Sequence, residues 1–136
     1  MGRLIDTNTF IESERGRLDL DSNIEAREGG SFFMSVVTAS ELLHGVHRAS
    51  PRFRDSRTAT IETWIARFPL IDIDLPIARD HAKIFADLKS RGEVIGAHDL
   101  WLAATCINRG LRIVTANVKE FSRIPNLEVE NWLNDF

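Results

Sequence analysis

The sequence predicts an α/β fold built around a mainly parallel β-sheet. Short apolar runs that suit buried strands alternate with longer segments of helical periodicity along the whole chain. Residues that break or cap helices, such as Pro51, Pro69 and Gly110, separate many of these segments. A length of 136 residues fits one domain, so we expect residues 1–136 to fold as a single unit.

The first expected strand lies almost at the start of the chain. Leu4 and Ile5 are apolar and suit a short buried strand that ends at Asp6. The polar residues that follow are typical of helix starts and favour a helix over residues 7–15. Residues 16–30 are polar and end in two glycines, so they indicate either a helix or a loop.

A second strand and two helices follow. The apolar run 32–37 predicts a buried strand, and Thr38 then begins the next helix, because its spacing from Glu41 is that of a capping box. Pro51 ends that helix. Apolar residues at helical spacing predict another helix over residues 52–68.

The second half of the chain repeats the alternation. A third strand is expected over residues 70–73, followed by a helix over residues 76–91 with a proline in its first turn. The next helix spans residues 96–109. Apolar runs at 111–114 and 127–129 predict the fourth and fifth strands, with a loop after the fourth.

Composition indicates a globular protein without a strong positive field. Hydrophobic residues make up 43% of the chain, charged residues 27%, and the formal net charge is −3. Fourteen of the 17 basic residues are arginines, which favour bidentate phosphate contacts, so a polyanionic substrate is not excluded. Cys106 is the one cysteine and allows no intrachain disulfide. Asp6 interrupts any signal peptide, and no apolar run approaches about 18 residues, so we expect no membrane contact and a cytoplasmic protein.

Acidic residues lie where the expected strands hand over to helices or loops. Asp6 follows the first strand, while Glu41 and Asp99 lie in the first turns of later helices. Glu120 follows the fourth strand, three residues after Asn117. In a parallel sheet these junctions share one edge, so we expect the acids to converge there.

Converging carboxylates indicate a metal-dependent reaction. They repel one another unless a cation lies between them, and hard oxygen ligands suit Mg²⁺ or Mn²⁺. Such an ion can activate water for attack on a phosphodiester. Each acid also has a simpler interpretation: Asp6, Glu41 and Asp99 could cap helices or complement their dipoles, and Glu120 could be a solvated loop residue.

Three segments carry a resemblance to a known family. They read LIDTN near the start, SVVTASELLHGV in the middle, and IGAHDLWLAATCINRGLRIVTANVKEF near the end. Together they resemble PIN domains, and more closely the VapC-type ribonuclease toxins of bacterial toxin–antitoxin pairs. The tail RIPNLEVENW is similar to the same subfamily, so the resemblance covers essentially the whole chain.

The resemblance implies a three-layer α/β/α fold with a central four- or five-stranded parallel sheet. It implies a Mg²⁺- or Mn²⁺-dependent endoribonuclease, a homodimer, and a small VapB-like antitoxin as partner. Asp6, Glu41 and Asp99 match the family's acidic positions and are the expected metal ligands, with either Asn117 or Glu120 at the fourth position. Supporting polar positions of the family are matched by Thr7, Asn8, Thr115 and Asn117.

Alternatives from other classes stay open. Arg48, Arg52 and Arg54 are candidates for phosphate contacts, or else form a solvated helix face. Asn117, an amide where many PIN domains have an acid, leaves room for an inactive RNA- or protein-binding module. A phosphotransferase with Asp6 as nucleophile would need a second nearby acid and a lysine, which the opening motif lacks.

Overall fold

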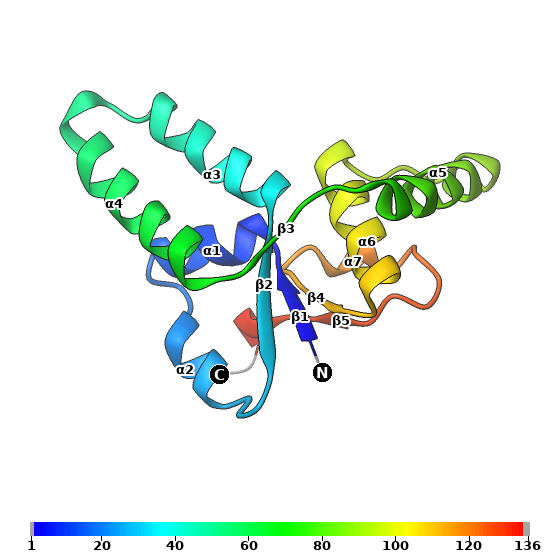
Figure 1. Cartoon of the computed structure of the whole chain (residues 1–136), viewed down its shortest axis with the longest axis horizontal. Helices are drawn as coiled ribbons and strands as arrows, with labels where there is room; N and C mark the ends of the chain where they lie inside the picture. The colour runs from blue at the N-terminus through cyan, green and yellow to red at the C-terminus, as the bar shows by residue number, and fades with distance from the viewer. Residues whose placement is uncertain (1, 135–136) are drawn as a thin grey trace.

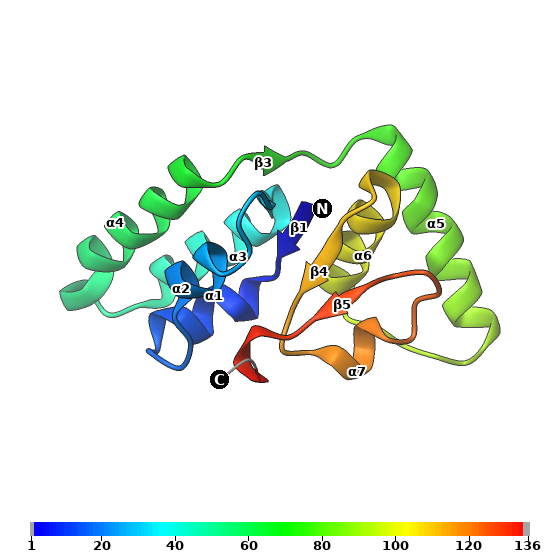
Figure 2. The ribbon, with the colours of Figure 1, turned by 90° about the horizontal axis from the view of Figure 1, so that it is seen from below.

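The computed structural model describes residues 2–134, and a parallel five-stranded sheet lies at its centre (Figures 1 and 2). The strand order is β3-β2-β1-β4-β5, and every neighbouring pair is parallel. Leu4 of the central strand pairs in register with Phe33 on one side and Ile113 on the other. The strands are β1 (Gly2–Ile5), β2 (Ser31–Ser35), β3 (Leu70–Ile71), β4 (Arg112–Val114) and β5 (Val129–Glu130).

Helices cover both faces of the sheet, which confirms the predicted three-layer arrangement. Figure 1 shows one group, α1 to α4, on one side of the strands and the other group, α5 to α7, on the opposite side. Their bounds are α1 (Thr7–Glu14), α2 (Leu20–Glu25), α3 (Val36–Arg48), α4 (Pro51–Arg67), α5 (Leu75–Ser90), α6 (Ala97–Arg109) and α7 (Val118–Phe121), with a short 3₁₀ turn η1 (Trp132–Asn134).

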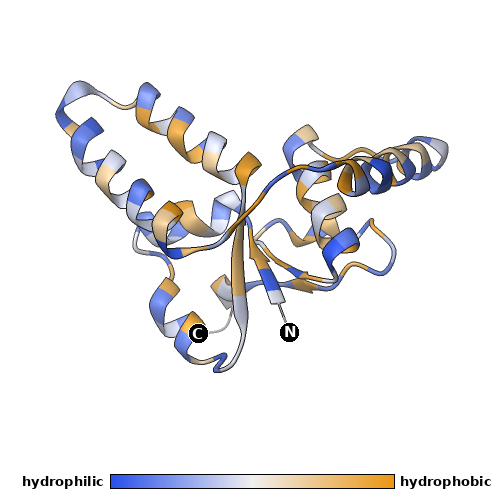
Figure 3. Ribbon diagram, in the orientation of Figure 1, coloured by the Kyte–Doolittle hydropathy of each residue, from blue (hydrophilic) through white to orange (hydrophobic). Residues whose placement is uncertain are grey.

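Two apolar cores separate the three layers. Successive residues of a strand point to opposite faces, so the fully buried Leu4 and Ile5 belong to different cores. Ile5 packs in the core with Phe10 of α1, whereas Leu4 packs in the core with Leu102 of α6. The apolar segments in Figure 3 follow the strands and the inner faces of the helices. A central strand buried on both faces explains the unbroken apolar run in the sequence.

The predicted elements are present, with shifted boundaries. The expected strand over 32–37 ends at Ser35, because the hydroxyl of Ser35 accepts the N–H of Val37 at 3.0 Å and starts α3 two residues early. The proposed capping box at Thr38 is therefore wrong, because Thr38 lies within the helix, and Glu41 lies in the second turn and not in the first turn as predicted.

Other differences lie at the edges of the sheet and in its loops. β3 has two residues where four were expected, and the fifth strand begins at Val129, later than expected. The expected loop after β4 contains the short helix α7. The segment 16–30 contains α2, whose N-cap Asp19 accepts the N–H of Ser22 at 3.1 Å. Gly110 ends α6 in the left-handed conformation, as its position in the sequence predicts.

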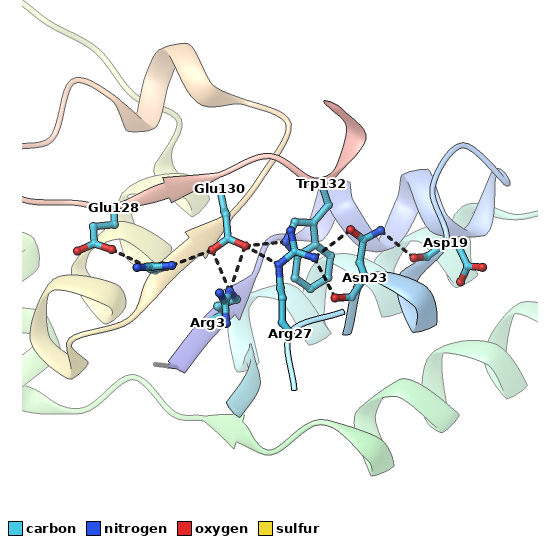
Figure 4. A network of polar contacts seen from close by, with 8 residues as sticks. Arg3, Asp19, Asn23, Arg27, Glu128, Glu130 and Trp132 are labelled. Atoms are coloured by element: carbon cyan, nitrogen blue, oxygen red, sulfur yellow. Dashed lines mark hydrogen bonds and ion pairs between the residues drawn. The ribbon is translucent and has the colours of Figure 1, made fainter. Parts of the chain in front are cut away.

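A cluster of charged side chains joins the two ends of the described chain (Figure 4). The carboxylate of Glu130 on β5 accepts hydrogen bonds from Arg3 of β1 at 2.8 Å and from Arg27 at 2.7 Å. The indole of Trp132 donates to the same carboxylate at 3.0 Å, and Arg27 lies over the Trp132 ring. These contacts hold β5 and η1 to the first third of the chain. No helix within residues 2–134 combines the length and apolar character needed to span a membrane.

Candidate active site

The strand order has a topological switch point between β1 and β4. After β1 the chain builds outward through β2 and β3, and it then returns to the other side of β1 as β4. Ligands of open α/β sheets bind at the carboxyl edge where the strand order reverses in this way. Asp6 directly follows β1 and Thr115 directly follows β4, and the N–H of Asp6 donates to the carbonyl of Val114 at 2.9 Å.

Asp6 occupies the N-cap position of α1, but its carboxylate does not cap the helix. It accepts the hydroxyl of Thr115 at 2.7 Å, and it is only 3% exposed. Burial raises the pKa of Asp6 to about 7; the hydrogen bond from Thr115 opposes this shift, and the charges of Asp99 and Glu41 add to it. The simple capping interpretation is therefore wrong for Asp6, whose carboxylate is within electrostatic reach of two other acids.

Glu41 points from α3 toward the N-terminus of α1. The hydroxyl of Thr7 donates to one of its carboxylate oxygens at 2.7 Å, and Nδ1 of His98 lies 3.0 Å from the other. The hydroxyls of Thr7 and Thr38 are 3.1 Å apart and buried. Glu41 thus joins α1, α3 and α6 at a single point.

Asp99 lies in the first turn of α6 and shares an amide with Glu120. The side-chain N–H₂ of Asn117 donates to the carboxylate of Asp99 at 3.1 Å and also to the carboxylate of Glu120. The second oxygen of Glu120 accepts the N–H of Gly96 at 3.1 Å. Burial, followed by the charge of Glu120, raises the pKa of Asp99 to about 6.

Glu120 differs from the other acids in its surroundings. The hydrogen bond from Asn117 lowers its pKa, the small burial cost opposes this, and the N–H of Gly96 lowers it further. Both of its oxygens are used, one on Asn117 and one on the N-terminus of α6. These contacts describe a residue that holds Asn117 and the start of α6 in place.

The remaining predicted polar residues brace the loop after β4. The hydroxyl of Thr115, which donates to Asp6, also accepts the N–H of Asn117 at 2.9 Å. The amide oxygen of Asn8 accepts the N–H of Ala116 at 3.3 Å. Thr115 is fully buried, so its hydroxyl is fixed between the two partners.

The donor set fits a hard divalent cation. Asp6, Glu41 and Asp99 offer carboxylate oxygens, and their mutual repulsion raises the pKa of Asp6 and of Asp99 beyond the effect of burial. As they stand within residues 2–134, no three His, Cys, Asp or Glu side chains lie close enough together to hold a metal ion. Hydrogen bonds from Thr7, Asn117 and Thr115 hold the acids instead.

The structure separates the predicted phosphate-binding arginines. Arg54 donates to the carbonyl of Ala49 at 3.1 Å and thereby closes the end of α3. Arg52 lies over the ring of Phe53, with its guanidinium carbon 5.4 Å from the ring centre. Arg48 alone of the three lines the hollow between α1, α3 and α4.

Sequence reasoning missed the roles of His98 and Gly96. His98 faces Glu41 across two helices, and the N–H of Gly96 binds Glu120. His98 lies directly before Asp99 in a first helical turn, which was the available signal. The backbone donor of Gly96 leaves no trace in the sequence.

Comparison with known proteins agrees with this geometry. The family model described as PIN domain matches residues 3–127. The chain belongs to the PIN domain family. Ribonuclease VapC1 of Rickettsia felis is 35% identical, with 95% of each chain covered. The tRNA(fMet)-specific endonuclease VapC of Salmonella typhimurium is 31% identical, covering 95% of this chain and 96% of the relative. The PIN domain therefore resembles the VapC type over nearly its full length.

Solved structures show the same fold. VapBC2 from Rickettsia felis, bound to a DNA fragment from its promoter, contains a chain that matches with a TM-score of 0.89 and 27% identity. That match covers 97% of this chain and 99% of the other. DNA-bound VapBC from Salmonella typhimurium matches with a TM-score of 0.88 and 28% identity, covering 97% and 98%.

Proposed function

We propose that residues 1–136 form one domain that is the toxin of a toxin–antitoxin pair, a metal-dependent endoribonuclease. The carrying observation is that the buried carboxylate of Asp6, at the carboxyl end of β1, lies within electrostatic reach of Glu41 and Asp99, which come from two distant segments. Relatives over the same length are named ribonuclease and endonuclease, which supports hydrolysis of RNA. The reaction proposed is cleavage of RNA phosphodiester bonds by activated water.

In this proposal Asp6, Glu41 and Asp99 hold one Mg²⁺ or Mn²⁺ ion. When bound, the ion neutralises developing charge on the phosphate and lowers the pKa of a water molecule. The chain itself holds the three carboxylates in place and keeps Asp6 away from bulk water. Hydrogen bonds or close polar contacts to these acids come from Thr115, Thr7, His98 and Asn117.

The partners proposed are RNA, a second copy of this chain and a small VapB-like antitoxin. Similar solved structures include a member of the VapBC family of toxin–antitoxin systems from Mycobacterium tuberculosis, with a TM-score of 0.75 and 29% identity. Other similar solved structures are VapBC from Rickettsia felis, Haemophilus influenzae and Salmonella typhimurium, which supports a VapB-like partner. We place the activity in the cytoplasm, where RNA substrates are present.

A second candidate function is an RNA- or protein-binding module without catalysis. Asn117 favours it, because an amide between Asp99 and Glu120 satisfies both carboxylates without a cation. The burial of Asp6 argues against it, since a buried carboxylate beside two other acids is costly to retain without a use.

The deciding experiment is cleavage of a mixed pool of structured RNAs by protein freed of any partner. Mg²⁺, Mn²⁺ and EDTA conditions are compared, with Asp99→Asn beside Asp72→Asn, an exposed acid that follows β3. We expect cleavage that needs the metal, disappears in Asp99→Asn and persists in Asp72→Asn. Equal cleavage by Asp99→Asn would refute the metal site. Absence of both cleavage and Mn²⁺ binding by calorimetry would favour the binding module.

A further inference from the structure

The helices α1, α3 and α4 lie on the same side of the sheet (Figure 1). A hollow with an excess of basic side chains lies between them. Its volume is about 490 Å³, and residues from the end of α1, the end of α3 and the first half of α4 line it. The lining residues that matter for its chemistry are Ile11, Glu14, Arg15, Gly45, Arg48 and Arg57.

The hollow lies along the same two helices, α1 and α3, as Thr7 and Glu41. Along α3, Gly45 and Arg48 lie four and seven residues after Glu41, so all three share one helix face. Along α1, Ile11 lies four residues after Thr7, and Thr7 is hydrogen-bonded to Glu41. At 1.5 Å per residue, Arg48 lies about 10 Å from Glu41 along the helix axis. Glu41 and the hollow therefore follow one another along the α1–α3 helix pair.

The hollow has an excess of positive charge. Within residues 2–134, Arg48 has no hydrogen-bond or ion-pair partner and is exposed. Arg15 lies 3.9 Å from Glu12, at the outer limit of an ion pair. Arg57 bonds Glu14 at 2.8 Å, but its buried Nε has no acceptor among the described residues. Three guanidinium groups thus face one carboxylate in the lining.

Gly45 contributes backbone but no side chain to the lining of the hollow. It lies in the interior of α3, where glycine costs about 1 kcal/mol relative to alanine. Its φ is not positive, so the backbone does not require glycine. A Cβ at this position would lie 3.8 Å from Nη2 of Arg57, an ordinary van der Waals contact, so this turn of α3 lies directly against the guanidinium.

We propose that this hollow binds a backbone phosphate of the RNA a nucleotide or two away from the cleaved bond. The inference rests on the proposed function and adds the position of the substrate strand. A polyanion approaching four acids meets repulsion, and guanidinium groups on the neighbouring turns of the same helices offset it. Arginine pairs with phosphate in a bidentate manner, and Arg48 has no partner within residues 2–134 that would compete. RNA is favoured over an acidic peptide because Arg48 lies on the same face of α3 as Glu41, about 10 Å along the axis.

The test is binding of a fluorescein-labelled, random-sequence RNA in EDTA, so that cleavage does not interfere, over a range of salt concentrations. We compare Arg48→Ala, Arg15→Ala and the matched control Arg79→Ala, an exposed arginine of α5. We expect Arg48→Ala to weaken binding roughly tenfold at low salt. The slope of log affinity against log salt should fall by about 0.7, as for one lost phosphate contact. Arg48→Lys should keep most of the slope, and Arg79→Ala should match the unaltered protein.

Cleavage by the unaltered protein with Mg²⁺ is scored separately, which distinguishes the two proposals. If the unaltered protein cleaves RNA while Arg48→Ala and Arg79→Ala show equal affinity and slope, the phosphate site is overturned and the nuclease proposal stands. A reduced slope for Arg48→Ala without any cleavage would support the phosphate site and count against the nuclease. Binding of polyglutamate is measured in the same way. If Arg48→Ala lost binding to polyglutamate while its RNA binding stayed unchanged, the hollow would be assigned to an acidic peptide and the inference would be overturned. Because Arg48 is exposed, the thermal midpoint should be unchanged, and circular dichroism checks this.

Discussion

Glu130 is expected to stabilise the fold through its charge, and replacing it with glutamine tests this. Its carboxylate accepts Arg3 at 2.8 Å, Arg27 at 2.7 Å and Trp132 at 3.0 Å (Figure 4). The side chains of Arg3, Arg27 and Glu130 are 12%, 17% and 20% exposed, so solvent screens them only in part. Glu130→Gln keeps the shape and leaves two largely buried arginines without their shared counter-charge.

The size of the effect follows from the pKa of Glu130. Burial raises this pKa, but the hydrogen bonds from Trp132, Arg3 and Arg27, with the charge of Arg3, together lower it from 4.5 to about 2. A shift of that size corresponds to about 3 kcal/mol at neutral pH, and partial exposure reduces it to about 2 kcal/mol. The lowered pKa means that this stabilisation is present above pH 4.5 and is lost as the pH falls toward 2.

Urea unfolding in EDTA at several pH values measures the effect. The difference in unfolding free energy between the unaltered protein and Glu130→Gln should be about 2 kcal/mol at pH 7 and should shrink steadily below pH 4.5. Glu128→Gln is the matched control: Glu128 is 58% exposed and pairs with Arg112 at the surface, so a much smaller loss is expected. A difference that stays constant down to pH 3 would refute the electrostatic reasoning and assign the loss to packing.

Three further predictions concern the site and the basic hollow. Asp6→Asn should abolish cleavage. It should nevertheless raise the unfolding free energy at pH 8 in EDTA by about 2–4 kcal/mol, because it removes a buried charge that lies among other acids. A thermal midpoint lower than that of Asp72→Asn would contradict this. Thr115→Val should lower the unfolding free energy by about 1–3 kcal/mol and reduce cleavage, since the hydroxyl donates to Asp6 and accepts the N–H of Asn117. Thr115→Ser should restore both the stability, measured by thermal melts, and the cleavage rate. Gly45→Ala should raise the unfolding free energy by about 0.5–1 kcal/mol in urea titrations, and a loss would show that the site has no room for a Cβ.

The sequence predicted the acidic edge because local rules place its residues. An apolar run that stops at Asp6, and helices that begin shortly before Glu41 and Asp99, require only strand and helix patterns. Parallel connections then bring such junctions to one edge of the sheet. The strand order, in contrast, could not be predicted from local patterns. Nothing local in Leu111 to Val114 specifies that β4 pairs with β1 and not with β3, since that choice depends on which core faces fit together.

Contacts between distant segments explain what the sequence did not reveal. Arg15 lines the basic hollow only because α1 ends beside the end of α3. The prediction of a phosphate-binding row in Arg48, Arg52 and Arg54 treated neighbours in sequence as neighbours in space. Arg48 ends α3 whereas Arg52 and Arg54 lie at the start of α4, so these side chains diverge, and Arg54 turns back to the carbonyl of Ala49.

Asn117 explains how the acidic edge can form without a cation. Its amide gives one N–H to Asp99 and the other to Glu120, so the two carboxylates share a neutral donor between them. Glu120, which also accepts the N–H of Gly96, has its pKa lowered, while Asp99 and Asp6 have theirs raised. The unfavourable charge is thus concentrated on Asp6 and Asp99, beside Glu41. An ion that binds there relieves repulsion at these three acids and gains little at Glu120, and this favours one bound cation over two.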